Sequence, residues 1–265
     1  MTTNADPARP AAAAPGIPAI RATGMVKRYG HLEALRGATI DLHPGEIVAL
    51  VGDNGAGKST LTKIICGAVQ ADAGELAFWG EPTRVQSIHH AHELGVHTVY
   101  QDLALAPHLS VADNLFLGRE PIRDGWRRLL GAVDRRQMID ETRAAMTRLG
   151  ISLRDYSAPV GDLSGGQRQA LAVARAITWA TTAVLMDEPT AALAPKQSAI
   201  VYQTVVAAAE RGLAVLVISH DIPRMLEIAH RIAVMRHGTV VAVRDARSLR
   251  LADVIGLMLG EEVSA

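Results

Sequence analysis

Short, continuously apolar runs alternate along this chain with stretches of helical period. The apolar runs are IVALVG (47–52), VHTVY (96–100), AVLMDE (183–188) and AVLVIS (214–219). Helical spacing of apolar residues follows near 165–179, 196–211 and 221–230. Strands buried on both faces are unbroken apolar runs, and helices between such strands are typical of parallel sheets. The pattern therefore predicts an α/β fold with a mainly parallel core sheet.

Two regions carry a different strand signal. In residues 20–28 and 38–43, apolar and β-branched residues are interrupted by polar residues, which predicts antiparallel strands near the start of the chain. Residues 231–245 are predicted to form a hairpin that turns at His237 and Gly238. We therefore expect an antiparallel β subdomain beside the core sheet.

The stretch 103–162 is polar and mostly of helical character, with its clearest helical period at 134–150. It predicts a helical insertion between sheet strands. We see no internal repeat. The expected organisation is an Ala/Pro-rich disordered tail (1–18), one single domain (19–250) with a helical subdomain at about 103–165, and a C-terminal helix or tail (251–265).

Composition narrows the function classes. Lys and Arg total 27 and Asp and Glu total 27, so the net charge is zero and gives no basis for binding nucleic acid. The single cysteine excludes an internal disulfide framework and a multi-cysteine metal site. No run approaches 18 apolar residues, and the prolines of the first segment interrupt any signal-peptide core. We expect a cytoplasmic protein.

GDNGAGKST at 52–60 has the spacing of a phosphate-binding loop, with an apolar strand before it and a predicted helix at 57–69 after it. Glycines let consecutive N–H groups point at phosphate oxygens, and the helix N-terminus adds partial positive charge. In such a loop the lysine bridges the β- and γ-phosphates and the serine hydroxyl binds Mg²⁺. The residues expected to bind ATP are Gly52, Asp53, Asn54, Gly55, Ala56, Gly57, Lys58, Ser59 and Thr60.

A second candidate follows the apolar run AVLM, where Asp187 and Glu188 precede Pro189. A carboxylate at the end of a strand can hold Mg²⁺ through water, so Asp187 is a candidate metal ligand together with Ser59. Glu188 is the candidate general base for the attacking water. The simpler interpretation is that Asp187 and Glu188 only form a turn at the end of a strand. The presence of a phosphate-binding loop in the same chain favours the functional interpretation.

LSGGQRQ at 163–169 opens a predicted helix and offers exposed N–H groups and a hydroxyl to an anion. One nucleotide does not need two phosphate-binding helix ends in the same chain. Ser164, Gly165, Gly166 and Gln167 are therefore expected to contact the γ-phosphate of ATP bound to a second subunit.

With LSGGQ between the other motifs, the chain resembles the ATP-binding subunits of ABC transporters over about residues 20–245. The motifs in the family's order are Tyr29, 52–60, Gln101, 163–167, Asp187-Glu188 and His220. The resemblance implies the P-loop NTPase fold of ABC ATPases, with an antiparallel β subdomain and a helical insertion. It also implies ATP and Mg²⁺ as cofactors.

The resemblance assigns further roles. Tyr29 would stack on adenine, Gln101 would touch Mg²⁺ and the attacking water, and His220 would contact the γ-phosphate, acting with the catalytic residues Lys58 and Glu188. Taken singly, Tyr29 could be a surface strand end, Gln101 a polar strand end, and His220 a cap of the following helix. One position departs from the family: Ala194 stands where an aspartate usually couples the two subunits.

Residues 99–121, with NLFLGRE (114–120) and PTAAL (189–193), resemble the ATPases of bacterial ribose, xylose and fructose importers. The resemblance implies a homodimer on the cytoplasmic face of the inner membrane. It would drive a separate membrane permease fed by a periplasmic sugar-binding protein, without nucleic acid. The alternatives are an ABC ATPase for another cargo, a non-transport ATP-dependent switch, and a catalytically weakened subunit.

Three further features have simpler explanations. The histidines 89, 90, 92 and 97 suggest a metal cluster, but solvated surface residues are the favoured interpretation. An arginine-rich stretch interleaved with acids predicts a solvated helical face: Arg119, Arg123, Arg127, Arg128, Arg135 and Arg136. Cys66 is expected to be a small core residue.

Overall fold

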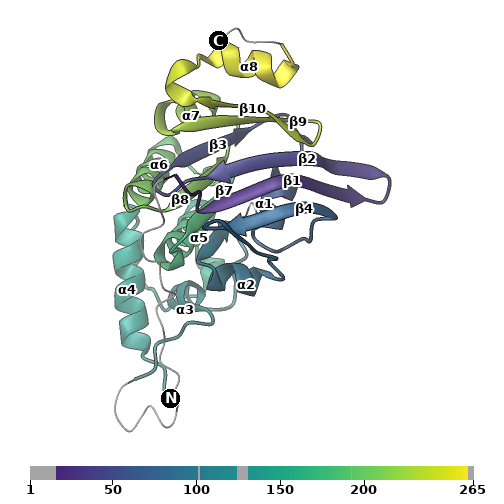
Figure 1. Cartoon of the computed structure of the whole chain (residues 1–265). Helices are drawn as coiled ribbons and strands as arrows, with labels where there is room; N and C mark the ends of the chain where they lie inside the picture. The colour runs from purple at the N-terminus through teal and green to yellow at the C-terminus, as the bar shows by residue number, and fades with distance from the viewer. Residues whose placement is uncertain (1–15, 101, 124–130, 192, 262–265) are drawn as a thin grey trace. The chain divides into compact units, whose positions relative to one another are not determined.

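The computed structural model describes residues 16–100, 102–123, 131–191 and 193–261 (Figure 1). It forms two compact units. Within the described residues, the first unit takes in the chain up to Thr98, Trp179–Glu188 and the chain from Val205. The second comprises Val99–Thr178 and Pro189–Thr204. Residues 1–15 of the predicted tail lie outside the described part of the chain.

A six-stranded sheet forms the core of the first unit, in the order β10-β9-β3-β8-β7-β6. Its strands are β3 (Ile47–Val51), β6 (Val96–Val99), β7 (Ala183–Asp187), β8 (Ala214–Ile218), β9 (Arg231–Arg236) and β10 (Thr239–Asp245). β3 pairs in parallel with β8 and β9, and β7 pairs in parallel with β8. Every residue of β3 and β8 is buried, as unbroken apolar runs require. The predicted α/β class and mainly parallel sheet are confirmed.

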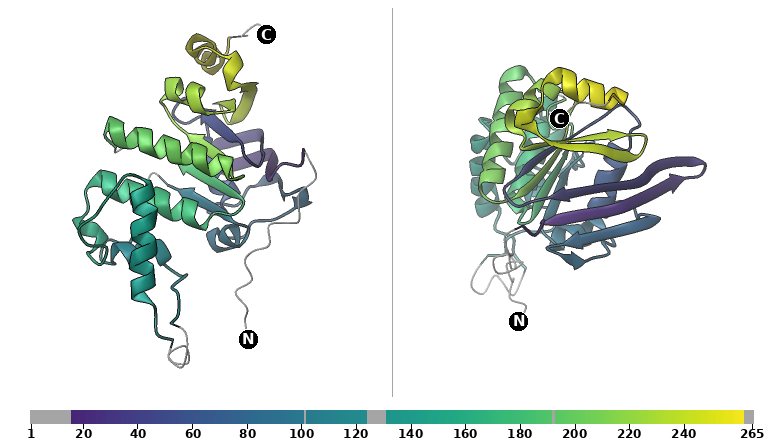
Figure 2. Two further views of the ribbon diagram at one scale, coloured as in Figure 1. Left: turned by 90° about the vertical axis from the view of Figure 1, so that its left-hand side faces the viewer. Right: turned by 45° about the horizontal axis from the view of Figure 1, so that its top comes forward.

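A second, antiparallel sheet has the order β2-β1-β4-β5 and appears as a separate layer in the right-hand view of Figure 2. Its strands are β1 (Ile20–Tyr29), β2 (Leu32–Leu42), β4 (Ala73–Phe78) and β5 (Glu81–Pro82). β1 and β2 confirm the predicted antiparallel pair, although β2 begins six residues before the predicted 38–43. β4 and β5 were not predicted, since β4 is largely exposed or half-buried and gives no apolar run.

The described part of the first unit also contains four α-helices: α1 (Lys58–Ile65), α2 (Ile88–Glu93), α7 (Ile222–Ile228) and α8 (Leu251–Leu259). The end of α6 (Pro195–Glu210), from Val205, belongs to this unit as well. α1 contacts β1 and β2 of one sheet and β7 of the other, so it fills the space between the sheets. It is shorter than the predicted 57–69, because Gly67 takes φ +72° and ends the helical path.

The hairpin of β9 and β10 confirms the predicted turn. His237 and Gly238 have φ +48° and +82°, the left-handed pair that a two-residue hairpin turn needs. The N–H of Gly238 donates to the carbonyl of Ala56 at 2.9 Å. The turn therefore contacts the phosphate loop.

The second unit holds the helices α3 (Val111–Phe116) and α4 (Arg135–Arg148). It also holds α5 (Gly165–Trp179) except for its last residue, and the part of α6 (Pro195–Glu210) up to Thr204. The left-hand view of Figure 2 shows α4 as the teal helix that runs down the page. The prediction that 103–162 is mostly helical is wrong for the described residues. Only α3, α4 and the short turn Val160–Asp162 are helical there. The other described residues of this stretch form turns and loops, with isolated bridges between Ile122 and Val133 and between Ser110 and Pro159.

Two of the side-chain interpretations can be compared with the structure. Cys66 is buried, as predicted. His89 is exposed, but the surface interpretation is wrong for His97, which is buried with its ring stacked on His92 at 4.3 Å between centroids. The residues that the structure describes contain no group of three His, Cys, Asp or Glu able to hold a metal. In the same residues, no helix has the length and apolar character needed to cross a bilayer.

Candidate nucleotide site

The backbone of the loop after β3 has two positions that only glycine can occupy without a clash. A Cβ on Gly52, at φ +151°, would lie 2.1 Å from the carbonyl oxygen of Met235. A Cβ on Gly57, at φ +106°, would lie 2.6 Å from the carbonyl oxygen of Ala34. The loop is thus pressed against two strands, which fixes the direction of its N–H groups.

Lys58 begins α1 and turns its side chain back into this loop. Its Nζ donates to the carbonyl oxygens of Gly52 at 2.7 Å and Asp53 at 2.9 Å. Burial lowers the pKa of Lys58, while the charges of Glu188, Asp187 and Asp53 act to raise it. The ammonium is therefore held by two backbone carbonyls of the loop, in electrostatic contact with Asp187 and Glu188.

The N-terminus of α1 has no side-chain cap. Its N-cap residue is Gly57, and its first turn contains no acid. Ser59 and Thr60 are half-buried, while Asp53, Asn54 and Gly55 are exposed and Ala56 is buried. The unsatisfied N–H groups and partial positive charge of a helix end suit an anion such as phosphate.

Two carboxylates end β7 next to this loop. Asp187 is the last residue of the strand, and the N–H of Glu188 donates to the carbonyl of Ile218 at 3.0 Å. Glu188 has φ +52°, a left-handed conformation that is uncommon outside glycine. Such strained backbone is often found at functional sites.

Glu188 and His220 form a pair. Nε2 of His220 lies 3.4 Å from Oε1 of Glu188, and their side chains are 59% and 17% exposed in that order. Burial raises the pKa of Glu188 and the charge of Asp187 adds to this, whereas His220 and Lys58 act to lower it. His220 does not cap α7, because the Asp221 side chain accepts from the N–H of Arg224. The helix-cap interpretation of His220 is therefore wrong.

Tyr29 ends β1 with its side chain accessible. The residue is 46% exposed, and Nζ of Lys27 lies 5.7 Å from its ring centroid. Lys27 is held in place by Asp72 at 2.7 Å. An exposed ring at a strand end is available for stacking on a flat ligand.

In the second unit, α5 begins with the LSGGQ residues. Oγ of Ser164 accepts from the N–H of Gln167 at 3.3 Å, and the Gln167 side chain accepts from the N–H of Ser164 at 2.9 Å. This reciprocal capping orders the helix start. Ser164 is exposed, and Gly165, Gly166 and Gln167 are half-buried, so the helix end is open to a ligand.

Gln101 lies outside the described residues, as do Arg127 and Arg128 of the arginine-rich stretch. The first unit brings together Lys58, Asp187, Glu188 and His220 around the loop. The LSGGQ residues belong to the second unit.

Arg175 is a residue that the sequence reasoning missed. It lies on α5, and its guanidinium donates to the carbonyls of Leu103 at 3.2 Å and Ala104 at 3.0 Å. Burial lowers the pKa of Arg175. The side chain therefore ties the segment just after Gln101 to the helix that carries LSGGQ.

Ala194 occupies the N-cap of α6. Its carbonyl accepts from the N–H groups of Gln197 and Ser198, both at 2.9 Å, but it has no side-chain oxygen for a capping bond. The first turn of α6 contains no acid either. The position where the family usually has an aspartate is thus a helix start without a cap.

We expect Ala194→Asp to raise the free energy of unfolding by about 1 kcal/mol, because an N-cap carboxylate accepts from the second or third helical N–H. Thermal and urea denaturation measure this gain. Ala194→Asn is the matched control, since it caps without charge and should give nearly the same gain. No gain from either substitution would contradict the assignment of Ala194 as an uncapped helix start.

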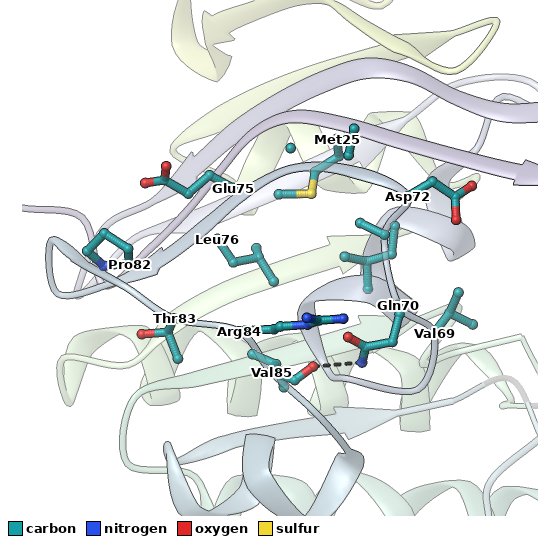
Figure 3. A pocket seen from close by; sticks show the side chains of 14 residues that line it. Met25, Val69, Gln70, Asp72, Glu75, Leu76, Pro82, Thr83, Arg84 and Val85 are labelled. Atoms are coloured by element: carbon teal, nitrogen blue, oxygen red, sulfur yellow. Dashed lines mark hydrogen bonds between the residues drawn. The ribbon is translucent and has the colours of Figure 1, made fainter.

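A separate hollow of about 550 Å³ lies between β4, β5 and the end of α1 (Figure 3). Its lining includes Met25, Leu76 and Arg84, and the Gln70 side-chain amide donates to the Val85 carbonyl at 2.8 Å. None of the residues assigned to the nucleotide lines it. The candidate site is therefore the loop with its carboxylates.

Comparisons with known proteins identify the family and the fold. Residues 35–191 match the family model described as ABC transporter. The match spans more than half of the chain, so the chain belongs to the ABC transporter family. The chain shares its fold with a nucleotide-free ATP-binding cassette from an ABC transporter (TM-score 0.76, 24% identity, 92% of this chain and 96% of that one).

Its sequence relatives include proteins named as sugar import subunits. The chain is 44% identical to the fructose import ATP-binding protein FrcA of Rhizobium meliloti, covering 92% of this chain and 94% of that protein. It is 39% identical to the xylose/arabinose import ATP-binding protein XylG of Sulfolobus acidocaldarius, covering 88% and 90%. A ribose import ATP-binding protein of Rubrobacter xylanophilus is 40% identical over 95% of this chain, which spans only 48% of that protein.

Proposed function

We propose that this ATP-binding subunit energises the uptake of a monosaccharide through a separate membrane permease. The observation that carries ATP hydrolysis is the grouping of Lys58, Asp187, Glu188 and His220 around one glycine loop. The observation that supports sugar import is the 44% identity to a fructose import ATP-binding protein over nearly the full length of both chains.

In this proposal the loop N–H groups and Lys58 hold the β- and γ-phosphates, and Tyr29 stacks on adenine. The fit to phosphate rests on the glycine path of the loop, the open helix end of α1 and the enclosed ammonium. Mg²⁺ would be held by the Ser59 hydroxyl, Gln101 and, through water, Asp187, all of which offer the oxygen ligands that this ion prefers. When bound, the ion would offset negative charge on the phosphates.

Glu188 is the proposed general base. A base works best when its pKa lies near the working pH, and burial already raises the pKa of Glu188. The nearby imidazole of His220 can orient this carboxylate and reach the γ-phosphate. A water molecule placed between Glu188 and that phosphate would lose a proton to the carboxylate as its oxygen bonds to the γ-phosphorus, while the bond from that phosphorus to the ADP oxygen breaks and ADP leaves.

Two copies of the chain are needed for the complete site in this proposal. Ser164, Gly165, Gly166 and Gln167 of one copy would contact the γ-phosphate on the other. Closure and reopening of the homodimer would move the permease, and a periplasmic sugar-binding protein would deliver the cargo. The subunit would work at the cytoplasmic face of the inner membrane, without nucleic acid.

The test is uptake of labelled pentoses, hexoses and polyols by cells that carry the native chain or Lys58→Ala. Loss of uptake of one sugar is the expected result, because the lysine is needed to hold ATP. Lys63→Ala is the matched control, since Lys63 is an exposed lysine on the same helix. Unchanged uptake of every sugar in the Lys58→Ala cells would overturn sugar import, whatever ATPase activity the purified protein shows.

A further inference from the structure

The end of β1, next to Tyr29, is held by Asp72, which stands immediately before β4. The N–H of Asp72 donates to the carbonyl of Val26 at 2.9 Å. Its carboxylate accepts from Nζ of Lys27 and from the N–H of Arg28, both at 2.7 Å. Figure 3 shows this carboxylate turned away from the other side chains that line the hollow. Asp72 therefore binds three consecutive residues of the strand that ends at Tyr29.

The side chain of Lys27 connects this clamp to the tyrosine ring. Lys27 and Tyr29 are two residues apart on a strand, so their side chains leave it on the same face. Nζ of Lys27 lies over the ring, 5.7 Å from its centroid, which is within the range of a cation–π contact. The Lys27 side chain is only 15% exposed, because the ion pair with Asp72 keeps it against the protein. One face of the ring is thus covered by a fixed ammonium.

The neighbouring cation does not compete for this clamp. The guanidinium of Arg28 donates from Nε and Nη2 to Oε1 of Glu33, at 3.0 and 2.9 Å. The hydrogen bond from Lys27, followed by the one from the N–H of Arg28, holds the pKa of Asp72 below its usual range. The carboxylate is therefore ionised at neutral pH, and the Lys27 ammonium is the charge that it pairs with.

The strand end that carries Tyr29 is also tied to the phosphate loop. Tyr29 pairs with Leu32 of β2. Two residues further along β2, the carbonyl oxygen of Ala34 lies 2.6 Å from the Cβ position of Gly57 in the loop. Because β2 touches both, a ring that is fixed on the end of β1 is fixed relative to the loop.

We propose that Lys27, held by Asp72, is a positioning residue for the adenine of ATP. It fixes the ring of Tyr29 so that the free face is already placed for the base when the phosphates enter the loop. Ordering a side chain during binding costs affinity, and a ring fixed in advance avoids that cost. The proposal rests on the proposed stacking of Tyr29 on adenine, and in it Lys27 does not touch the nucleotide.

Equilibrium binding of ATP to the full-length chain tests this role. Lys27→Met keeps the aliphatic stem and removes the ammonium. It should weaken ATP binding about 2- to 5-fold, because fixing the ring is worth no more than the exposed cation–π contact that fixes it. Turnover at saturating ATP should stay at the native value. Arg21→Met, at an exposed arginine near the other end of β1, is the matched control and should change neither quantity.

The decisive comparison is a double-mutant cycle with Tyr29→Ala. Tyr29→Ala should weaken ATP binding by itself, and adding Lys27→Met to it should have no further effect. An equal loss from Lys27→Met with and without the Tyr29 ring would overturn the proposal, since Lys27 would then act on another part of the nucleotide or on the fold.

Asp72→Asn is a second, independent variant. The amide keeps an acceptor for the N–H of Arg28 but removes the charge that holds Lys27. It should weaken ATP binding as Lys27→Met does, and the two substitutions together should weaken it no more than either alone. Additive losses would overturn the proposed clamp. The melting temperature should change little, because exposed ion pairs contribute little to stability.

The same data separate this proposal from the proposed function. Unchanged ATP binding by Tyr29→Ala would show that the ring does not stack on adenine, and both assignments would fail. Weaker binding by Tyr29→Ala with native binding by Lys27→Met would leave the stacking in place and overturn only the positioning role.

Discussion

Glu188→Gln should lower the ATPase rate by about 10²- to 10⁴-fold, the contribution typical of a positioned general base. The amide keeps the shape of the side chain but cannot take a proton from water. ATP binding should be unchanged, because the loop and Lys58 are intact. Steady-state turnover and equilibrium binding of a fluorescent ATP analogue measure the two effects.

The matched control is Glu210→Gln, at an exposed glutamate at the end of α6, which should keep the native rate. His220→Ala should also slow turnover, because it removes the group 3.4 Å from the Glu188 carboxylate. A Glu188→Gln protein that turns over ATP at the native rate would show that another group removes the proton.

The same substitution has a signature in folding stability. The pKa of Glu188 is raised in the folded state by burial, so the folded state binds its proton more tightly than the unfolded state does. Ionised Glu188 therefore destabilises the fold increasingly as pH rises above the ordinary carboxylate range, up to the raised pKa. Glu188→Gln should gain stability over the native chain across that window and keep a constant advantage above it. A pH-independent difference would contradict the burial of this carboxylate.

The parts of the site predicted from the sequence are those with a local signal. The phosphate loop, the strand-end carboxylates and LSGGQ are each short runs whose spacing has a backbone reason. The core strands were found because burial on both faces leaves no polar interruption, as in β3 and β8. These features do not depend on distant partners.

The features that were missed depend on partners far away in the chain. Arg175 bonds to carbonyl oxygens 71 and 72 residues away, and carbonyls carry no residue identity. The sequence contains His92 and His97, but not the turn between α2 and β6 that stacks their rings. The sequence of α8 indicates an apolar helix, but it does not indicate which side of that helix packs against the rest of the first unit. The sequence therefore predicts what can bind ATP better than it predicts what holds the site in place.

The largest expected effect on folding comes from Gly52→Ala. The added Cβ would lie 2.1 Å from the carbonyl oxygen of Met235, a residue of β9 paired with Val240 of β10. The carbonyl cannot move far without disturbing the hairpin, so the loop or β9 must shift. Overpacking and a left-handed alanine together should cost about 3–5 kcal/mol. That is a large part of the stability of an ordinary protein.

Gly55→Ala is the matched comparison in the same loop. Gly55 has φ +82°, but nothing lies within 4 Å of its Cβ position, so only the backbone cost of about 1–2 kcal/mol remains. Thermal denaturation should therefore show a melting temperature that falls by about 10 °C for Gly52→Ala and by a few degrees for Gly55→Ala. Equal losses would mean that the close approach of Gly52 to β9 does not constrain the loop. A much larger loss at Gly52 would show that contact with the hairpin, beyond glycine's backbone freedom, sets the path of the phosphate loop.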